Sequence, residues 1–167
     1  MRAGYRGRGG LIRFDLFGRR FVVYFRKVQE IKGLNSECKD GTHIGMVDID
    51  DDDIVYLREE LKRVMFVYGI PRADIMSTGK PGGFHLYLWK GFTFRESLKV
   101  MMEFSTCDLA HIRWTIKRGH ATLRLTDKGG RKIKKIETIY RGGDGERQLW
   151  DLKSWVRYQS GVWADDG

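Results

Sequence analysis

Two aspartates in the segment 44–50 are the first residues of this sequence whose type and spacing could do chemistry. The segment is rich in β-branched and other apolar residues, which predicts a strand. Side chains alternate between the two faces of a strand, so Asp48 and Asp50 project from the same face. Neighbouring carboxylates repel each other, and a divalent cation with a preference for oxygen ligands, Mg²⁺ or Mn²⁺, relieves that repulsion.

A plainer explanation of the same aspartates is a solvated strand end followed by a helix. The helix dipole favours negative side chains at an N-terminus. This explanation accounts well for Asp51–Asp53, which can cap a helix running to about Tyr68. It accounts poorly for Asp48, which lies among apolar residues inside the predicted strand.

A glycine-rich segment over 77–85, Ser-Thr-Gly-Lys-Pro-Gly-Gly-Phe-His, is the second candidate. Its glycines permit positive φ and close backbone approach, so amide groups could point at a phosphate while Lys80 and His85 add charge or hydrogen bonds. The segment is not a P-loop, because proline follows the Gly-Lys pair and a strand is expected next. An ordinary hairpin loop between strands at 73–77 and 83–90 is the alternative that the residues leave open.

Asp108 is the third candidate. It could add a metal ligand if the chain returns beside Asp48, or it could cap a helix over 109–118, and the two roles fit the sequence equally. If Asp108 is only a cap, Glu103 or Glu137 could take its place as a ligand.

The charge distribution favours a polyanionic partner. The chain has 31 Lys and Arg against 22 Asp and Glu, a net charge of +9. Five of the acids lie at 48–53, so the rest of the chain carries 31 − 17 = +14. Residues 1–27 and 113–135 hold 17 of the 31 cations, which predicts a surface for a nucleic-acid backbone.

The cysteines and the hydropathy pattern exclude other classes. Cys38 and Cys107 are the only cysteines and lie far apart, which excludes a disulfide framework, gives no reason to expect zinc, and predicts two buried side chains. No apolar run reaches the roughly 18 residues of a membrane span. We therefore expect no membrane association and an intracellular, cytoplasmic location.

The order of the expected strands and helices that position these residues predicts an α+β fold in one domain over 1–167. We expect residues 1–10 to be a flexible basic N-terminus. From residue 44 to 140 the pattern alternates strands and helices, which predicts a sheet with helices on one face and the other face open for chemistry. An N-terminal β-hairpin is expected at 11–17 and 20–28, around Gly18, followed by a polar stretch at 29–42. The remaining expected elements are a capping-box helix at 93–104, strands at 121–126 and 133–140 joined by a turn at 127–130, and a C-terminal helix at 148–158.

Taken together and in this order, Met46–Asp50, Ser77–His85 and Cys107-Asp108 resemble the three motifs of the archaeo-eukaryotic primase superfamily. Those motifs are a hydrophobic-DxD strand, a Ser-x-Gly-rich turn ending in His, and a later hydrophobic-Asp. The resemblance covers about half of the chain, and its short spacing is similar to that of the compact primase-polymerases. It implies an RRM-like catalytic sheet over 44–140.

The resemblance also implies template-directed nucleotidyl transfer on single-stranded DNA in replication, with NTP or dNTP as substrate. Asp48, Asp50 and Asp108 would be catalytic and would hold two ions, Mg²⁺ or Mn²⁺. The residues that would bind the triphosphate are Ser77, Gly79, Lys80 and His85, with Arg124 and Lys128 added from their position at the end of the following strand and turn. We expect no helicase or template-reading segment within these 167 residues, which leaves a helicase or another replication protein open as a partner for initiation.

Two other functions remain compatible with the residues. One is a non-catalytic nucleic-acid-binding module of the same fold, which would stack bases on Trp89, Phe92 and Trp114. The other is a metal-dependent nuclease that uses the same carboxylates.

Overall fold

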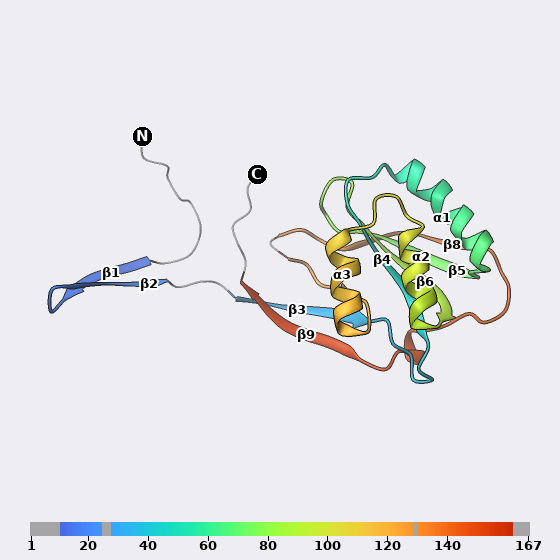
Figure 1. Ribbon diagram of the computed structural model, residues 1–167. Helices are drawn as coiled ribbons and strands as arrows, with labels where there is room; N and C mark the ends of the chain where they lie inside the picture. The colour runs from blue at the N-terminus through green and yellow to red at the C-terminus, as the bar shows by residue number, and fades with distance from the viewer. Residues whose placement is uncertain (1–10, 25–27, 129, 162–167) are drawn as a thin grey trace.

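The structure is a computed structural model that describes residues 11–24, 28–128 and 130–161. Within these ranges the chain is an α+β protein with antiparallel sheets and three α-helices (Figure 1). The N-terminal residues 1–10, expected to be flexible, lie outside the described residues.

The N-terminal β-hairpin is confirmed. Strands β1 (Leu11–Leu16) and β2 (Arg19–Tyr24) pair antiparallel around a two-residue turn. Both turn residues, Phe17 and Gly18, have positive φ, as a tight hairpin turn with the correct twist requires.

A four-stranded antiparallel sheet carries most of the predicted motifs. Its strands lie in the order β4-β6-β5-β8, with bounds β4 (His43–Ile49), β5 (Arg72–Ser77), β6 (Phe84–Phe92) and β8 (Lys134–Tyr140). Because β6 is antiparallel to both β4 and β5, those two strands are parallel to each other. Helix α1 (Ile54–Tyr68) is the crossover between them.

The helices begin at predicted residues, and α1 and α3 also end where predicted. The Asp53 carboxylate accepts a hydrogen bond from the Val55 amide at the start of α1, and Gly69 ends that helix in the left-handed region. Helix α2 (Phe94–Met102) begins with the expected capping box of Thr93 and Glu96, and it ends two residues before the predicted position. Helix α3 (Leu109–Arg118) begins after Asp108.

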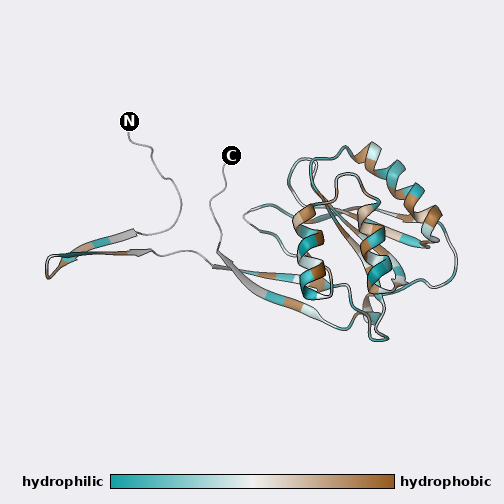
Figure 2. Cartoon of the chain, viewed as in Figure 1, coloured by the Kyte–Doolittle hydropathy of each residue, from teal (hydrophilic) through white to brown (hydrophobic). Residues whose placement is uncertain are grey.

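One hydrophobic core joins the helices to the sheet. Figure 2 shows hydrophobic and hydrophilic residues mixed on each helix, as in amphipathic helices with one buried side. Leu57 and Leu61 of α1 and Met101 of α2 are fully buried, in the same cluster as Val47 and Leu86 of the sheet. Cys38 and Cys107 are buried free thiols, as expected.

The region outside this sheet differs from the prediction. The stretch 29–42, expected to be a polar connection, begins with the strand β3 (Val28–Asn35). The strand expected at 121–126 is only β7 (Thr122–Arg124), and it pairs with β3 rather than with 134–140. The turn at 127–130 therefore links two sheets instead of forming a hairpin, because β8 pairs with β5.

The C-terminal helix predicted at 148–158 is wrong. A single 3-10 turn, η1 (Leu149–Asp151), is followed by the strand β9 (Trp155–Gly161), which pairs with β3 along its length. The apolar residues of this segment are compatible with helical spacing, but Trp and Val also favour a strand, and the unpaired edge of β3 supplies the partner.

Candidate functional site

The free edge of β4 is where the structure brings the three predicted aspartates together. The Asp108 amide donates to the Asp48 carbonyl at 2.8 Å, and the Asp50 amide donates to the Thr106 carbonyl at 3.2 Å. Nε2 of the buried His111 donates to the Met46 carbonyl at 3.0 Å. The segment 106–111 thus covers the edge of β4, and it places Asp108 beside aspartates that lie some sixty residues earlier in the chain.

Asp48 is the most perturbed carboxyl group of the cluster. Its side chain is 31% exposed, compared with 48% for Asp50. Burial, followed by the charges of Asp50 and Asp108, raises the pKa of Asp48 to about 7. Keeping all three carboxylates ionised therefore costs free energy, and a bound cation would offset that cost by neutralising part of the negative charge.

His85 lies directly across from Asp48 in the β4–β6 pair, on the same face of the sheet. Its Nε2 is 3.6 Å from Oδ1 of Asp48, and its side chain is nearly fully buried. Burial and then the charge of Arg124 lower the pKa of His85 to about 3, so its ring is neutral at physiological pH. Among the residues that the structure describes, none hydrogen-bonds its Nδ1.

The glycine-rich turn folds against the acidic end of β4. Nζ of Lys80 lies 3.0 Å from Oδ1 of Asp50 and 3.3 Å from Oδ1 of Asp51. A side chain at Gly79 would place its Cβ 2.8 Å from the backbone nitrogen of Lys132, so only glycine fits there. The Ser77 hydroxyl accepts from the Gly79 amide at 3.2 Å and is thereby occupied within the turn.

Arg124 and Lys128, the two basic residues expected to contact the triphosphate, lie in different places relative to the acidic cluster. Nη2 of Arg124 donates to the Thr78 carbonyl at 2.9 Å, so Arg124 is brought to the turn and lies close enough to affect Asp48 and His85 electrostatically. Lys128 lies on a separate turn, where its backbone pairs with Arg131. No bond within the described ranges joins Lys128 to the aspartates.

Asp108 combines the two roles that the sequence left open. Its Oδ1 accepts from the Ala110 amide at 2.8 Å, so it is the N-cap of α3, and it also contributes charge to the acidic cluster. The substitutes considered for it are engaged elsewhere. Glu103 binds Arg63 and Tyr68, and Glu137 binds Arg58 of α1.

The donor set suits a hard cation, although the side chains do not form a closed cage. Asp48, Asp50 and Asp108 supply carboxylate oxygens, the ligands that Mg²⁺ and Mn²⁺ prefer. Lys80 and the Ala110 amide already occupy two of these carboxylates. In keeping with this, the described part of the chain contains no group of three or more His, Cys, Asp or Glu side chains placed to hold a metal ion.

The sheet face of Asp48 and His85, expected to be open, is largely buried, so that expectation is wrong, and it carries a buried polar row that was missed in the sequence. Tyr87 follows His85 by two residues and is 3% exposed, with no hydrogen-bond partner for its hydroxyl among the described residues. Beside it, Asp74 accepts from Trp89 Nε1 at 2.7 Å and pairs with Lys135 at 2.7 Å. The alternation of 85, 87 and 89 along β6 was the signal that could have found this row.

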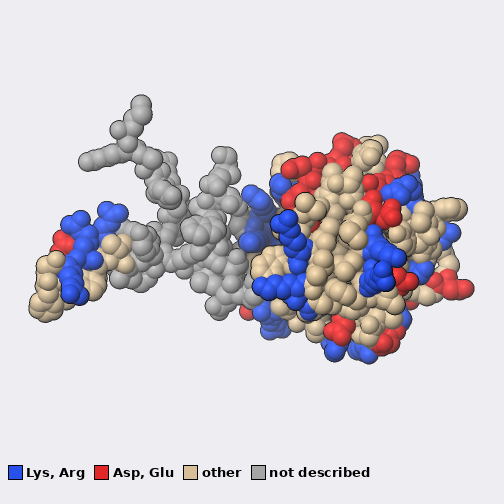
Figure 3. All heavy atoms as spheres, viewed as in Figure 1, with Lys and Arg blue, Asp and Glu red and all other residues tan. Residues whose placement is uncertain are grey.

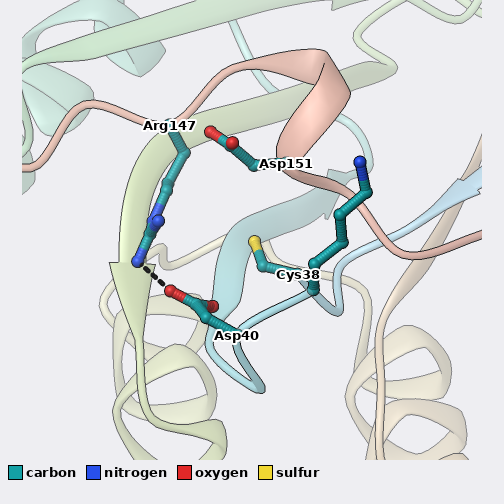
Figure 4. A pocket seen from close by; sticks show the side chains of 5 residues that line it. Cys38, Asp40, Arg147 and Asp151 are labelled. Atoms are coloured by element: carbon teal, nitrogen blue, oxygen red, sulfur yellow. Dashed lines mark hydrogen bonds and ion pairs between the residues drawn. The ribbon is translucent and has the colours of Figure 1, made fainter.

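A small pocket lies away from the acidic cluster (Figure 4). Its volume is about 80 Å³, well below the several hundred that a nucleotide-sized ligand needs. Arg147 points at Asp40 across the pocket and pairs with it, so the charges there are partly satisfied within the chain. The residues that line it are Cys38, Lys39, Asp40, Arg147 and Asp151.

Together, the fold and the site describe an α+β protein with an acidic cluster at one end of its central sheet, bordered by a glycine-rich turn. The chain matches no known protein family, no curated protein and no solved structure. None of the helices in the described ranges is both long enough and apolar enough to cross a membrane.

Proposed function

We propose that this chain is a small metal-dependent nucleotidyltransferase domain of the primase-polymerase type, which joins nucleotides on a single-stranded DNA template. The observation that carries the proposal is the convergence of three motifs at one end of one sheet. Asp108 is hydrogen-bonded to Asp48 through the backbone, His85 lies across from Asp48, and Lys80 reaches Asp50. These residues come from three separate segments of the chain.

The strand order supports an RRM-like core. β4, β6 and β5 lie side by side in that order, with α1 between β4 and β5 and α2 after β6. In this arrangement the last residues of β4 and the first residues of β6 bring the first and second motifs to the same end of the sheet. The edge strand β8 extends the sheet beyond β5.

The residues present suggest a division of roles. Asp48, Asp50 and Asp108 would hold two Mg²⁺ or Mn²⁺ ions, which would supply activation of the attacking hydroxyl and neutralisation of the pyrophosphate. Lys80 and Arg124 would meet the triphosphate of an NTP or dNTP, with the backbone of Gly79 close by. The neutral His85 can donate a hydrogen bond to a phosphate without adding charge.

The test is extension of a labelled primer on a single-stranded template with nucleotides and Mg²⁺ or Mn²⁺. The double variant Asp48→Asn/Asp50→Asn should reduce product about 100-fold or more, because it removes the charges that hold the ions. A matched control, Asp15→Asn/Asp144→Asn, removes two exposed carboxylates elsewhere and should extend the primer as the unsubstituted chain does. Product that survives the first substitution would refute the assigned site.

A non-catalytic nucleic-acid-binding module is the second candidate, and one observation favours it. The ion pair of Lys80 with Asp50, together with the capping role of Asp108, neutralises part of the acidic cluster without a metal.

Two of the aromatic residues expected to stack bases, Trp89 and Phe92, are buried and so are not available for stacking. Binding of DNA without extension would favour this candidate, and shortening of the strand without nucleotide would favour a nuclease.

A further inference from the structure

The outer face of α3 combines positive charge with an exposed aromatic ring. The helix Leu109–Arg118 contains no Asp or Glu. His111 and Thr115 are buried on its inner side. Ala110, Arg113, Trp114, Lys117 and Arg118 are exposed and follow one another at helical spacing, and the apolar Leu109 and Ile116 are also exposed.

Trp114 is exposed to solvent, and two cations of the same helix lie near its ring. It is 50% exposed. Nζ of Lys117 lies 4.9 Å from the centre of its ring, and the guanidinium carbon of Arg118 lies 5.1 Å from it. Cation–π contacts of this kind hold the indole in place, and an immobilised ring loses less entropy when a flat ligand stacks on it.

This face is tied to the acidic cluster by the helix itself. The helix begins at Asp108, which is hydrogen-bonded to Asp48, and Trp114 follows six residues later. At 1.5 Å per residue, Trp114 lies about 9 Å along the axis from the cap, a distance of one to two nucleotides of extended strand. Figure 3 shows Lys and Arg atoms gathered along the edge of the molecule beside α3 and acidic atoms over the end where α1 begins.

We infer that the outer face of α3 is a binding surface for single-stranded nucleic acid, on which Trp114 stacks on an unpaired base. Arg113, Lys117 and Arg118 contact the neighbouring phosphates. A stacking ring needs an unstacked base, and a duplex does not offer one, so the surface selects single strands. The inference rests on the proposed function only in taking the bound strand to be the template that enters the acidic cluster.

The test measures binding of a fluorescently labelled oligo(dT) by anisotropy, without nucleotide or metal. Trp114→Ala should weaken the affinity about 10-fold, the effect of losing one stacked base. Trp150→Ala is the matched control, because Trp150 is also exposed, at 71%, but lies on η1 away from this face, and it should bind as the unsubstituted chain does. Lys117→Gln should lower the salt dependence of binding by about one released counterion.

The outcome separates this inference from the proposed function. Binding that depends on Trp114 without primer extension would support the inference and contradict the proposed function. Trp114→Ala binding equal to that of the unsubstituted chain would overturn the inference, whether or not the chain extends primers. If Trp114→Ala lost binding to anionic phospholipid vesicles but kept binding to oligo(dT), the inference would also be overturned, and the outer face of α3 would be assigned to a membrane surface.

Discussion

Replacing Asp48 by asparagine should stabilise the protein at neutral and alkaline pH. The substitution keeps the shape of the side chain and removes its charge. In the native state the pKa of Asp48 is raised to about 7, first by burial and then by Asp50 and Asp108. An acid whose pKa is raised on folding favours the native state only while it is protonated, so this contribution is complete below about pH 4 and is lost as the pH rises through 7.

The size of the effect follows from that displacement of the pKa. A change from the ordinary value of 3.8 to about 7 corresponds to about 4 kcal/mol in the free energy of unfolding, since each tenfold change in proton affinity is worth about 1.4 kcal/mol. The Asp48 side chain is 31% exposed, and solvent screening reduces the effect. We expect Asp48→Asn to raise the free energy of unfolding by about 1–2 kcal/mol at pH 8 and by nothing measurable at pH 4.

Urea unfolding followed by tryptophan fluorescence across this pH range measures the effect. Asp144→Asn, an exposed carboxylate, is the control and should change the stability little at any pH. Mg²⁺ should raise the stability of the unsubstituted chain more than that of Asp48→Asn, because a bound ion stabilises the state that binds it. A stability gain from Asp48→Asn that is absent at pH 8, or equal at pH 4 and pH 8, would refute the account of a strained acidic cluster.

Two further substitutions test the packing around the site. Tyr87→Phe should leave the free energy of unfolding unchanged or raise it by about 1 kcal/mol, because the buried hydroxyl has no hydrogen-bond partner among the described residues; a loss above 1 kcal/mol in urea unfolding would mean that the hydroxyl has one. Asp53→Ala should lower the free energy of unfolding by about 1 kcal/mol, because it removes the 2.7 Å hydrogen bond to the Val55 amide that caps α1, and an unchanged urea midpoint would contradict that role.

Much of the fold could be predicted where local signals are strong. The cap at Asp53, the stop at Gly69 and the box at Thr93 each depend on residues within one helical turn, so the sequence contains the whole signal. The segment 148–158 shows the opposite case. Its residues fit both a helix and a strand, and the choice was made by β3, which lies more than a hundred residues away in the chain.

The site divides in the same way. Alternation along a strand predicted that Asp48 and Asp50 share a face, but β4 ends at Ile49, so strand geometry places only Asp48 and Asp50 lies just beyond the strand. The place of Asp108 depends on how 106–108 returns to β4, and no local pattern contains that information. The engagement of Lys80 by Asp50 could not be predicted either, because it arises from a turn thirty residues away along the chain.

Asp108 links the two surfaces on which the proposals depend. Its amide binds β4 at Asp48 and its carboxylate caps α3, so one residue joins the acidic cluster to the helix that presents Trp114. A β-bridge and a helix are stiffer connections than a loop, and the separation between cluster and ring is therefore set by backbone hydrogen bonds. A template-directed reaction needs the strand held at a constant distance from the reacting groups. The backbone hydrogen bond of Asp108 to Asp48 and its capping of α3 therefore serve the same purpose. The residue that caps the helix also fixes where the helix begins relative to the acidic cluster.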